Sequence, residues 1–126
     1  FLADAALSAG DLELAQVTLA NAMHLAQANR DLLAFAELQR LKGCLEVHRG
    51  NTDEGTEYLE AAIATARKQN AGLYELRAAI DLARLKQDHA KTKDAIEILL
   101  PVYSRFTEGF DTIDLRDGKA LLDELS

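Results

Sequence analysis

Apolar residues recur along this chain at spacings of three and four, with polar residues between them. This spacing is typical of amphipathic helices. It predicts helices at 12–28, 32–48, 53–69, 73–87, 92–107 and 112–125, and it places the end of a further helix at 1–9. Alternation of apolar and polar residues never persists, so no strand is expected. The predicted fold class is all-α.

The same pattern returns every 40 residues without an insertion. Five columns keep this register: Ala3, Gly43 and Ala83; Gly10, Gly50 and Ala90; Ala15, Gly55 and Ala95; Leu19, Leu59 and Leu99; Ala22, Ala62 and Val102. A period of this length indicates a stacked helical-repeat array. We expect one repeat domain over 1–126, with a truncated first repeat at 1–31, repeats at 32–71 and 72–110, and a capping helix at 111–126. The truncation predicts that the chain is a fragment of a longer protein.

Turn and capping residues set the expected helix boundaries. Gly10-Asp11 reads as a turn in which Asp11 caps the following helix. Thr52 or Asp53 is expected to cap the helix after Gly50, and Asp111 or Thr112 the last one. Within the helix at 92–107, Pro101 predicts a bend, or a break near Leu99. Gly118 lies inside the last helix, where glycine costs about 1 kcal/mol relative to alanine.

Charge and composition exclude several classes of function. The net charge of −7 disfavours binding to nucleic acid or to anionic membranes. No apolar run approaches the length needed to span a bilayer. Cys44 is the single cysteine, so no internal disulfide forms, which suits a reducing compartment. A cytoplasmic location is expected.

No residue pattern supports catalysis, a cofactor or a metal. Gly109 and Gly118-Lys119 fail the spacing of a phosphate-binding loop. The acidic residues Asp111, Asp114 and Asp117 are spaced for a helix face rather than for a calcium loop. The three histidines lack metal-ligand spacing, and Cys44 is expected to pack as a small apolar residue. We expect no enzyme activity in this chain.

Small residues within each copy resemble the tetratricopeptide pattern. Gly43, Gly55 and Ala62 are followed at the same offsets by Ala83, Ala95 and Val102, with Leu59 and Leu99 between the last two positions of each set. Longer helices would account for the 40-residue period, as in tetratricopeptide-like arrays of regulators of the LuxR/MalT type. The resemblance implies a right-handed superhelix of antiparallel helix pairs. HEAT and armadillo repeats share the period and are the structural alternative.

The C-terminal part resembles one family more closely. The stretches 73–79, 82–85, 100–112, 114–115 and 119–125 look like the extreme C-terminus of bacterial predicted ATPases. These are often described as adenylate or guanylate cyclases or as winged-helix transcriptional regulators. The resemblance implies that a cyclase or DNA-binding domain and an ATPase domain lie upstream, with this chain as the tetratricopeptide tail. The chain departs from the pattern at Ser104-Arg105 and at Asp117-Gly118.

In a tetratricopeptide array the first helix of each pair lines the concave groove. Counted from Gly43 and Ala83, the groove-facing candidates are Glu37, Arg40, Cys44, Val47, Arg77, Ile80, Arg84 and Gln87. The segments 32–50 and 72–90 carry net charges of +1 and 0, less acidic than most of the remainder. This predicts a groove that receives an acidic peptide. The alternative is that these arginines pair with carboxylates along or between helices.

Three functions remain open at this point. The first is a protein-interaction scaffold, the sensory or regulatory tail of an ATPase-type signalling regulator, which binds a protein or other domains of its parent chain. The second is a small-molecule sensor with an inducer in the groove. The third is a homodimerisation module that uses the apolar N-terminal end at Leu2, Ala6 and Leu7. Tyr103, Phe106 and Phe110 are expected to hold the last helix in place, or else to form an aromatic binding patch.

Overall fold

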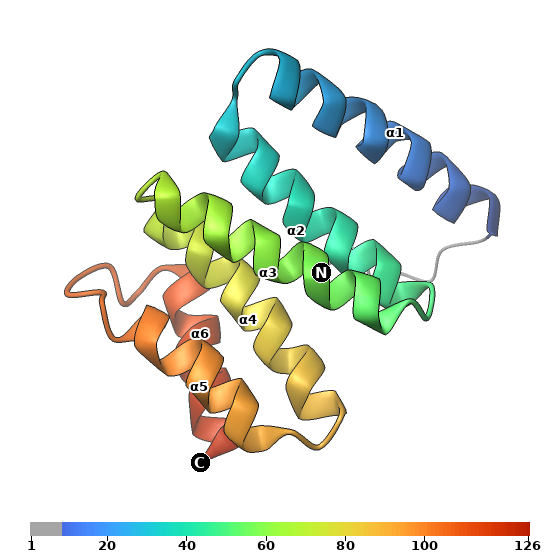
Figure 1. Ribbon diagram of the computed structural model, residues 1–126. Helices are drawn as coiled ribbons and strands as arrows, with labels where there is room; N and C mark the ends of the chain where they lie inside the picture. The colour runs from blue at the N-terminus through green and yellow to red at the C-terminus, as the bar shows by residue number, and fades with distance from the viewer. Residues whose placement is uncertain (1–8) are drawn as a thin grey trace.

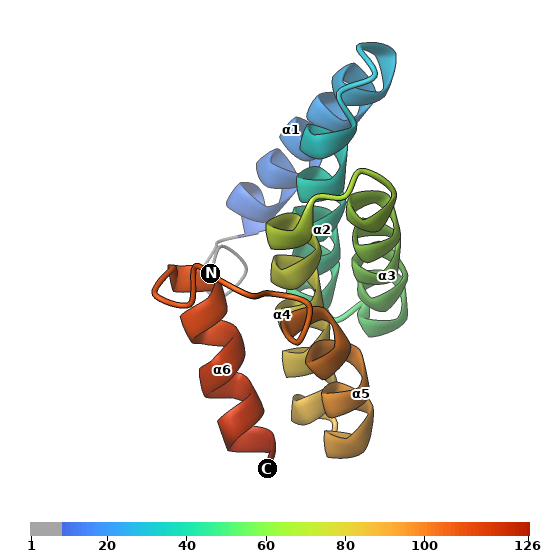
Figure 2. The ribbon, with the colours of Figure 1, turned by 90° about the vertical axis from the view of Figure 1, so that its left-hand side faces the viewer.

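The computed structural model describes residues 9–126, and over this range it is built from six α-helices with no strand, which confirms the all-α prediction (Figure 1). The helices are α1 (Ala9–Ala28), α2 (Leu32–His48), α3 (Thr52–Lys68), α4 (Gly72–Asp88), α5 (Thr92–Tyr103) and α6 (Ile113–Leu125). Each of α1 to α5 packs against the next helix along the chain, and α6 packs against both α4 and α5. Seen from the side, α6 lies at the opposite end of the molecule from the α1–α2 turn (Figure 2).

Four turns of one geometry join α1 through α5. The residue with positive φ in each turn is Arg30 (55°), Gly50 (89°), Asn70 (55°) or Ala90 (58°). The next residue donates its N–H to a carbonyl five positions earlier, over 2.8–2.9 Å: Asp31 to Ala26, Asn51 to Glu46, Ala71 to Ala66, and Lys91 to Lys86. This is the Schellman arrangement, which satisfies the last carbonyls of each helix. Equal spacing of these turns gives α2, α3 and α4 their equal lengths.

Close approach of two glycines joins α2 to α3. A Cβ on Gly43 would lie 3.0 Å from the carbonyl oxygen of Gly55, and one on Gly55 would lie 2.8 Å from that of Gly43. Only hydrogen fits at these two positions. The two backbones therefore approach each other closely, and Leu59 is buried beside them.

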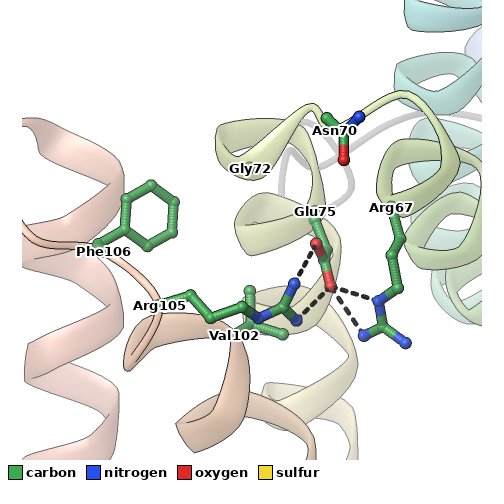
Figure 3. Close-up of a pocket in the computed structure, with 7 residues that line it drawn as sticks. All are labelled: Arg67, Asn70, Gly72, Glu75, Val102, Arg105 and Phe106. Atoms are coloured by element: carbon green, nitrogen blue, oxygen red, sulfur yellow. Dashed lines mark hydrogen bonds and ion pairs between the residues drawn. The ribbon is translucent and has the colours of Figure 1, made fainter.

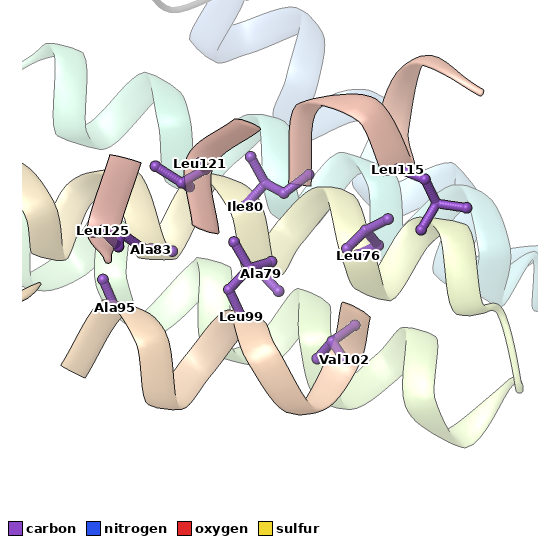
Figure 4. Packing of buried hydrophobic residues seen from close by; sticks show 10 residues of the cluster. All are labelled: Leu76, Ala79, Ile80, Ala83, Ala95, Leu99, Val102, Leu115, Leu121 and Leu125. Carbon is purple, nitrogen blue, oxygen red and sulfur yellow. The ribbon is translucent and has the colours of Figure 1, made fainter. Parts of the chain in front are cut away.

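The main apolar core lies where α4, α5 and α6 meet (Figure 4). It consists of the buried residues Leu76, Ala79, Ile80, Ala83, Ala95, Leu99, Val102, Leu115, Leu121 and Leu125. Gly118 packs on this core: a Cβ there would lie 3.2 Å from Cδ2 of Tyr103. The glycine lets α6 approach α4 and α5 closely, which gives it a packing role.

The aromatic seam expected before the last helix is present in part. Tyr103 and Phe106 pack against the core, and the rings of Tyr103 and Phe110 lie 6.1 Å apart. Phe110 itself is exposed.

Several expected boundaries are wrong. Gly10 and Asp11 lie inside α1 rather than in a turn, because one helical glycine costs only about 1 kcal/mol and the residues after it are good helix formers. The helix expected at 92–107 ends at Tyr103, yet it is not broken near Leu99. Pro101 lies in its last turn, where the missing N–H removes a single helical hydrogen bond. The helix end expected at 1–9 falls almost wholly outside the described residues.

Two capping expectations also differ from the structure. Thr52 and Asp53 lie within α3, and the N-cap is Asn51, whose side chain makes no capping hydrogen bond. Its amide binds the carboxylate of Glu46 instead. Thr112 is the N-cap of α6, as expected, but likewise without a capping hydrogen bond from its side chain.

Candidate functional site

The predicted groove residues lie on the helices α2 and α4, and Glu37, Arg40 and Arg77 among them are joined by a chain of ion pairs. Arg40 of α2 binds Glu37 on its own helix and Asp81 on α4, both over 2.7 Å. Arg77 of α4 reaches Glu37 over 3.5 Å and Asp114 of α6 over 3.1 Å. The chain of charges therefore links α2, α4 and α6.

The pKa values of the groups in these ion pairs follow from their contacts. Burial raises the pKa of Glu37, but the hydrogen bonds and charges of Arg40 and Arg77 outweigh burial and hold this pKa below its usual value. Burial dominates at Asp81 and raises its pKa, against the opposing effects of Arg40, the Cys44 thiol and Arg84. Arg40 remains a cation, because its two carboxylate partners outweigh burial and raise its pKa. Arg40 and Arg77 are thus neutralised from within the protein.

The other groove candidates are placed as follows. Cys44 and Ile80 are buried, and the Cys44 thiol lies 3.5 Å from Oδ2 of Asp81. Val47 is partly buried against the small core shared by α2, α3 and α4, beside Gly55. Gln87 donates to Glu124 of α6 over 3.3 Å.

Arg84 is the most exposed of the three arginines, and no ion pair engages it within residues 9–126. The sequence analysis did not identify Asp81 or Asp114 as partners, because the pairing depends on how α2, α4 and α6 are placed in space.

A pocket of about 250 Å³ opens elsewhere, where the end of α3, the start of α4 and the end of α5 meet (Figure 3). It is lined by Arg67, Asn70, Gly72, Glu75, Val102, Arg105 and Phe106. Glu75 is 3% exposed. Its Oε2 accepts hydrogen bonds from Nε of Arg67 over 2.9 Å and from Nη2 of Arg105 over 2.8 Å. Figure 3 shows the two guanidinium groups on either side of this carboxylate.

Sequence reasoning missed this pocket, although the repeat columns held a sign of it. Glu75 occupies the column of Phe35 and Leu115, so a charged residue replaces an apolar one. A buried carboxylate requires partners, and two arginines supply them. Both arginines keep more than half of their side-chain surface exposed, at 57% for Arg67 and 53% for Arg105.

A second buried carboxylate, Glu46, closes the turn between α2 and α3. It accepts hydrogen bonds from Lys42, Arg49 and Asn51 over 2.8–3.1 Å. Burial raises its pKa, but these three donors outweigh burial and hold the pKa below its usual value. Every bond of this cluster lies within 42–51, so it stabilises a turn rather than forming a site.

The outer face of α1, here meaning Leu14, Val17 and Leu25, is apolar and open to solvent. These three side chains are 66%, 55% and 60% exposed. Forty residues later α3 carries Glu54, Glu57 and Thr65 in the same columns, and α5 with the residues after it carries Asp94, Glu97 and Arg105. The other two copies thus have polar residues where α1 has apolar ones.

Within residues 9–126, no three His, Cys, Asp or Glu side chains gather in a way that would hold a metal ion. None of the helices in this range has the length and apolar character needed to cross a bilayer. Comparison with protein-family models, with curated proteins and with solved structures found no match to this chain.

Proposed function

We propose that this chain is a helical-repeat protein-interaction module and that the outer face of α1 is its interaction surface. The observation that carries the proposal is the apolar character of Leu14, Val17 and Leu25, at columns that are polar in the other two copies. It is favourable for another apolar surface to cover an exposed apolar stripe on a helix. Isolated exposed apolar residues need no explanation, but three that share one face of one helix do.

The occupant that fits this face best is α1 of a second copy, in antiparallel orientation. Leu14 would then lie opposite Leu25 of the second copy, and the two-fold axis would pass between Val17 and Asn21. The same flank of each helix carries Glu13 and His24, both exposed. Antiparallel pairing places Glu13 near His24 of the second copy at two symmetric positions, where an imidazole N–H can donate to the carboxylate. A helix of this length offers about 30 Å of contact.

The concave groove is a weaker candidate for the interaction surface. Its acidic-peptide hypothesis rested on the three arginines, and two of them bind Glu37, Asp81 and Asp114 within the protein. A peptide carboxylate would have to displace these internal partners and leave them unpaired. Only Arg84 remains available for such a ligand, so the groove stays a secondary proposal.

We also propose that the array is tetratricopeptide-like and forms the regulatory tail of an ATPase-type signalling protein. The evenly spaced turns and the Gly43–Gly55 contact support the repeat type, and the resemblance of 73–125 supports the parent family. HEAT-like stacking is the alternative. The sequence upstream of Phe1 tests the parentage, since an ATPase motif or a cyclase domain there is the expected result. A parent without either domain would contradict it.

Sedimentation velocity over a range of concentrations tests the interaction surface. We expect the chain to dimerise and the double variant Leu14→Glu, Val17→Glu to remain a monomer. Both substitutions copy the residues of α3 at the same columns, so the helix should tolerate them. The matched control is Leu100→Glu, at an exposed leucine on α5, which should still dimerise. A wild-type chain that stays monomeric at every concentration would contradict the proposal.

A further inference from the structure

We propose that the Glu75 pocket binds the carboxylate group of a small apolar acid. The pocket holds two arginines and one carboxylate, so its charged groups sum to one positive charge (Figure 3). Glu75 is buried and engaged by both guanidinium groups, whereas Arg67 and Arg105 are each more than half exposed. A second carboxylate can therefore approach the arginines from the solvent side without displacing Glu75.

The hydrogen-bonding capacity of the arginines supports this assignment. Arg67 uses Nε and Nη2 to bind Glu75, and its Nη1 has no partner among the described residues. Arg105 places Nη1 and Nη2 on the two oxygens of Glu75, over 3.3 and 2.8 Å. Nε of Arg105 donates to the carbonyl oxygen of Pro101 over 3.4 Å. Each guanidinium carries five N–H donors, and these acceptors do not occupy them all. Charge-assisted bonds to an incoming carboxylate would use the remaining donors.

The rest of the lining defines the kind of acid. Val102 and Phe106 present apolar surface, and Phe106 stands at one side of the pocket opposite the Arg67 side in Figure 3. Asn70 adds an amide at the rim. The volume of about 250 Å³ lies below the range of roughly 300–1,000 Å³ that is typical of drug-sized ligands. A monoanion with a compact apolar or aromatic body matches both the lining and the single positive charge, whereas a phosphate dianion does not.

This site is independent of the interaction surface proposed above. The pocket is formed by α3, α4 and the end of α5, whereas α2 is the one helix of residues 9–126 against which α1 packs. Failure of self-association would therefore leave ligand binding intact, and failure of ligand binding would leave the dimer intact. The pocket also lies outside the groove residues identified from the sequence.

Titration with benzoate, followed by NMR of the Arg Nε–H and Asn70 side-chain signals, tests the proposal at fixed ionic strength. We expect saturable chemical-shift changes at Arg67, Arg105 and Asn70. Acetate should bind more weakly than benzoate because it lacks the apolar body. Phosphate should be weaker than benzoate as well. Phosphate binding as tight as benzoate at the same residues would overturn the ligand class, and absence of saturable shifts with benzoate would overturn the site.

Four variants separate a ligand site from a merely structural ion triad. Arg67→Gln and Arg105→Gln each leave Glu75 with one arginine, and each should weaken benzoate binding by about tenfold, the value of one charge-assisted hydrogen bond. Arg84→Gln, at an exposed arginine outside the pocket, should leave binding unchanged. Glu75→Gln removes the competing carboxylate and should strengthen binding severalfold. Arginine variants that bind benzoate as the wild type does would overturn the proposal, even if Glu75→Gln fails to fold.

Discussion

Gly43 of α2 and Gly55 of α3 lie so close that neither position has room for a methyl group. A Cβ on Gly55 would lie 2.8 Å from the carbonyl oxygen of Gly43. The corresponding pair in the next copy is Ala83 and Ala95, so that copy accommodates two methyl groups. The α2–α3 pair is therefore packed more tightly than α4–α5 along the same columns.

Substitution of Gly55 by alanine tests this packing. Alanine is the better helix former by about 1 kcal/mol, yet we expect a net destabilisation of about 1–3 kcal/mol, because the backbones must separate. Chemical denaturation measures the change. Gly72→Ala is the control, since the nearest atom there is the ring edge of Phe106 at 3.3 Å, and its effect should be small. A Gly55→Ala variant more stable than the wild type would contradict the close approach.

The turns offer a reciprocal pair of substitutions at one column. Gly50 and Ala90 both have positive φ, at 89° and 58°, and alanine pays a steric cost there that glycine does not. We expect Ala90→Gly to stabilise the protein by about 1 kcal/mol and Gly50→Ala to destabilise it by a similar amount. No atom lies within 4 Å of a Cβ at Gly50, so that effect is conformational alone. Thermal unfolding of both variants provides the measurement. Stability changes of the same sign in both variants would contradict the shared turn geometry.

Charge reversal at Arg77 and Arg84 distinguishes the ion-pair chain from an open groove. From the sequence alone, both reversals would weaken partner binding without unfolding the chain. The structure changes that expectation for Arg77, because Arg77→Glu places a third carboxylate beside Glu37 and Asp114. We expect a loss of about 1–2 kcal/mol for Arg77→Glu, against less than about 0.5 kcal/mol for Arg84→Glu. Equal unfolding free energies for the two variants would refute this difference.

The pH dependence of the unfolding free energy should report on Glu46. Its pKa is held below the usual 4.5, so its stabilising effect is complete above pH 4.5 and is lost as the pH falls through the lower pKa of the folded state. We expect Glu46→Gln to lower the unfolding free energy at neutral pH by about 1–2 kcal/mol. The variant should then lose less unfolding free energy than the wild type as the pH falls. Glu60→Gln, at an exposed glutamate on α3, is the control for the loss of one carboxylate and should leave the unfolding free energy at neutral pH unchanged. An identical profile for Glu46→Gln would contradict the assignment.

Periodicity alone was sufficient to predict the helices from α2 to α4, whose bounds agree with expectation within one residue. The apolar positions there recur without a competing pattern, and equal turns follow each helix. The boundary at Gly10 failed because one glycine was given more weight than the structure gives it. The helix expected at 92–107 failed in the opposite sense, because it was extended past its end at Tyr103. A local preference of about 1 kcal/mol does not decide a boundary when neighbouring residues favour the helix.

The charged sites were less accessible to sequence reasoning. Arg40 and Arg77 were identified as groove residues, but their partners Asp81 and Asp114 lie 41 and 37 positions away, and no periodicity predicts such a pairing. Glu75 and the outer face of α1 were detectable in principle. Both appear as columns in which one copy departs from the polarity of the others. Comparison of polarity within a column, in addition to residue size, would have revealed them.

The distance between two copies of α1 tests the proposed interaction most directly. Single nitroxide labels at Ala20 or Gln27, in a Cys44→Ala background, lie on one exposed flank of α1. With the two-fold axis midway between Leu14 and Leu25, the antiparallel pair offsets the two Ala20 labels by only about 2 Å along the helix axis and the two Gln27 labels by about 22 Å. We therefore predict a short intermolecular distance from Ala20 and a clearly longer one from Gln27 in pulsed electron resonance. Equal distances at both positions would contradict the account. So would the absence of intermolecular coupling at concentrations where sedimentation shows that dimer formation is complete.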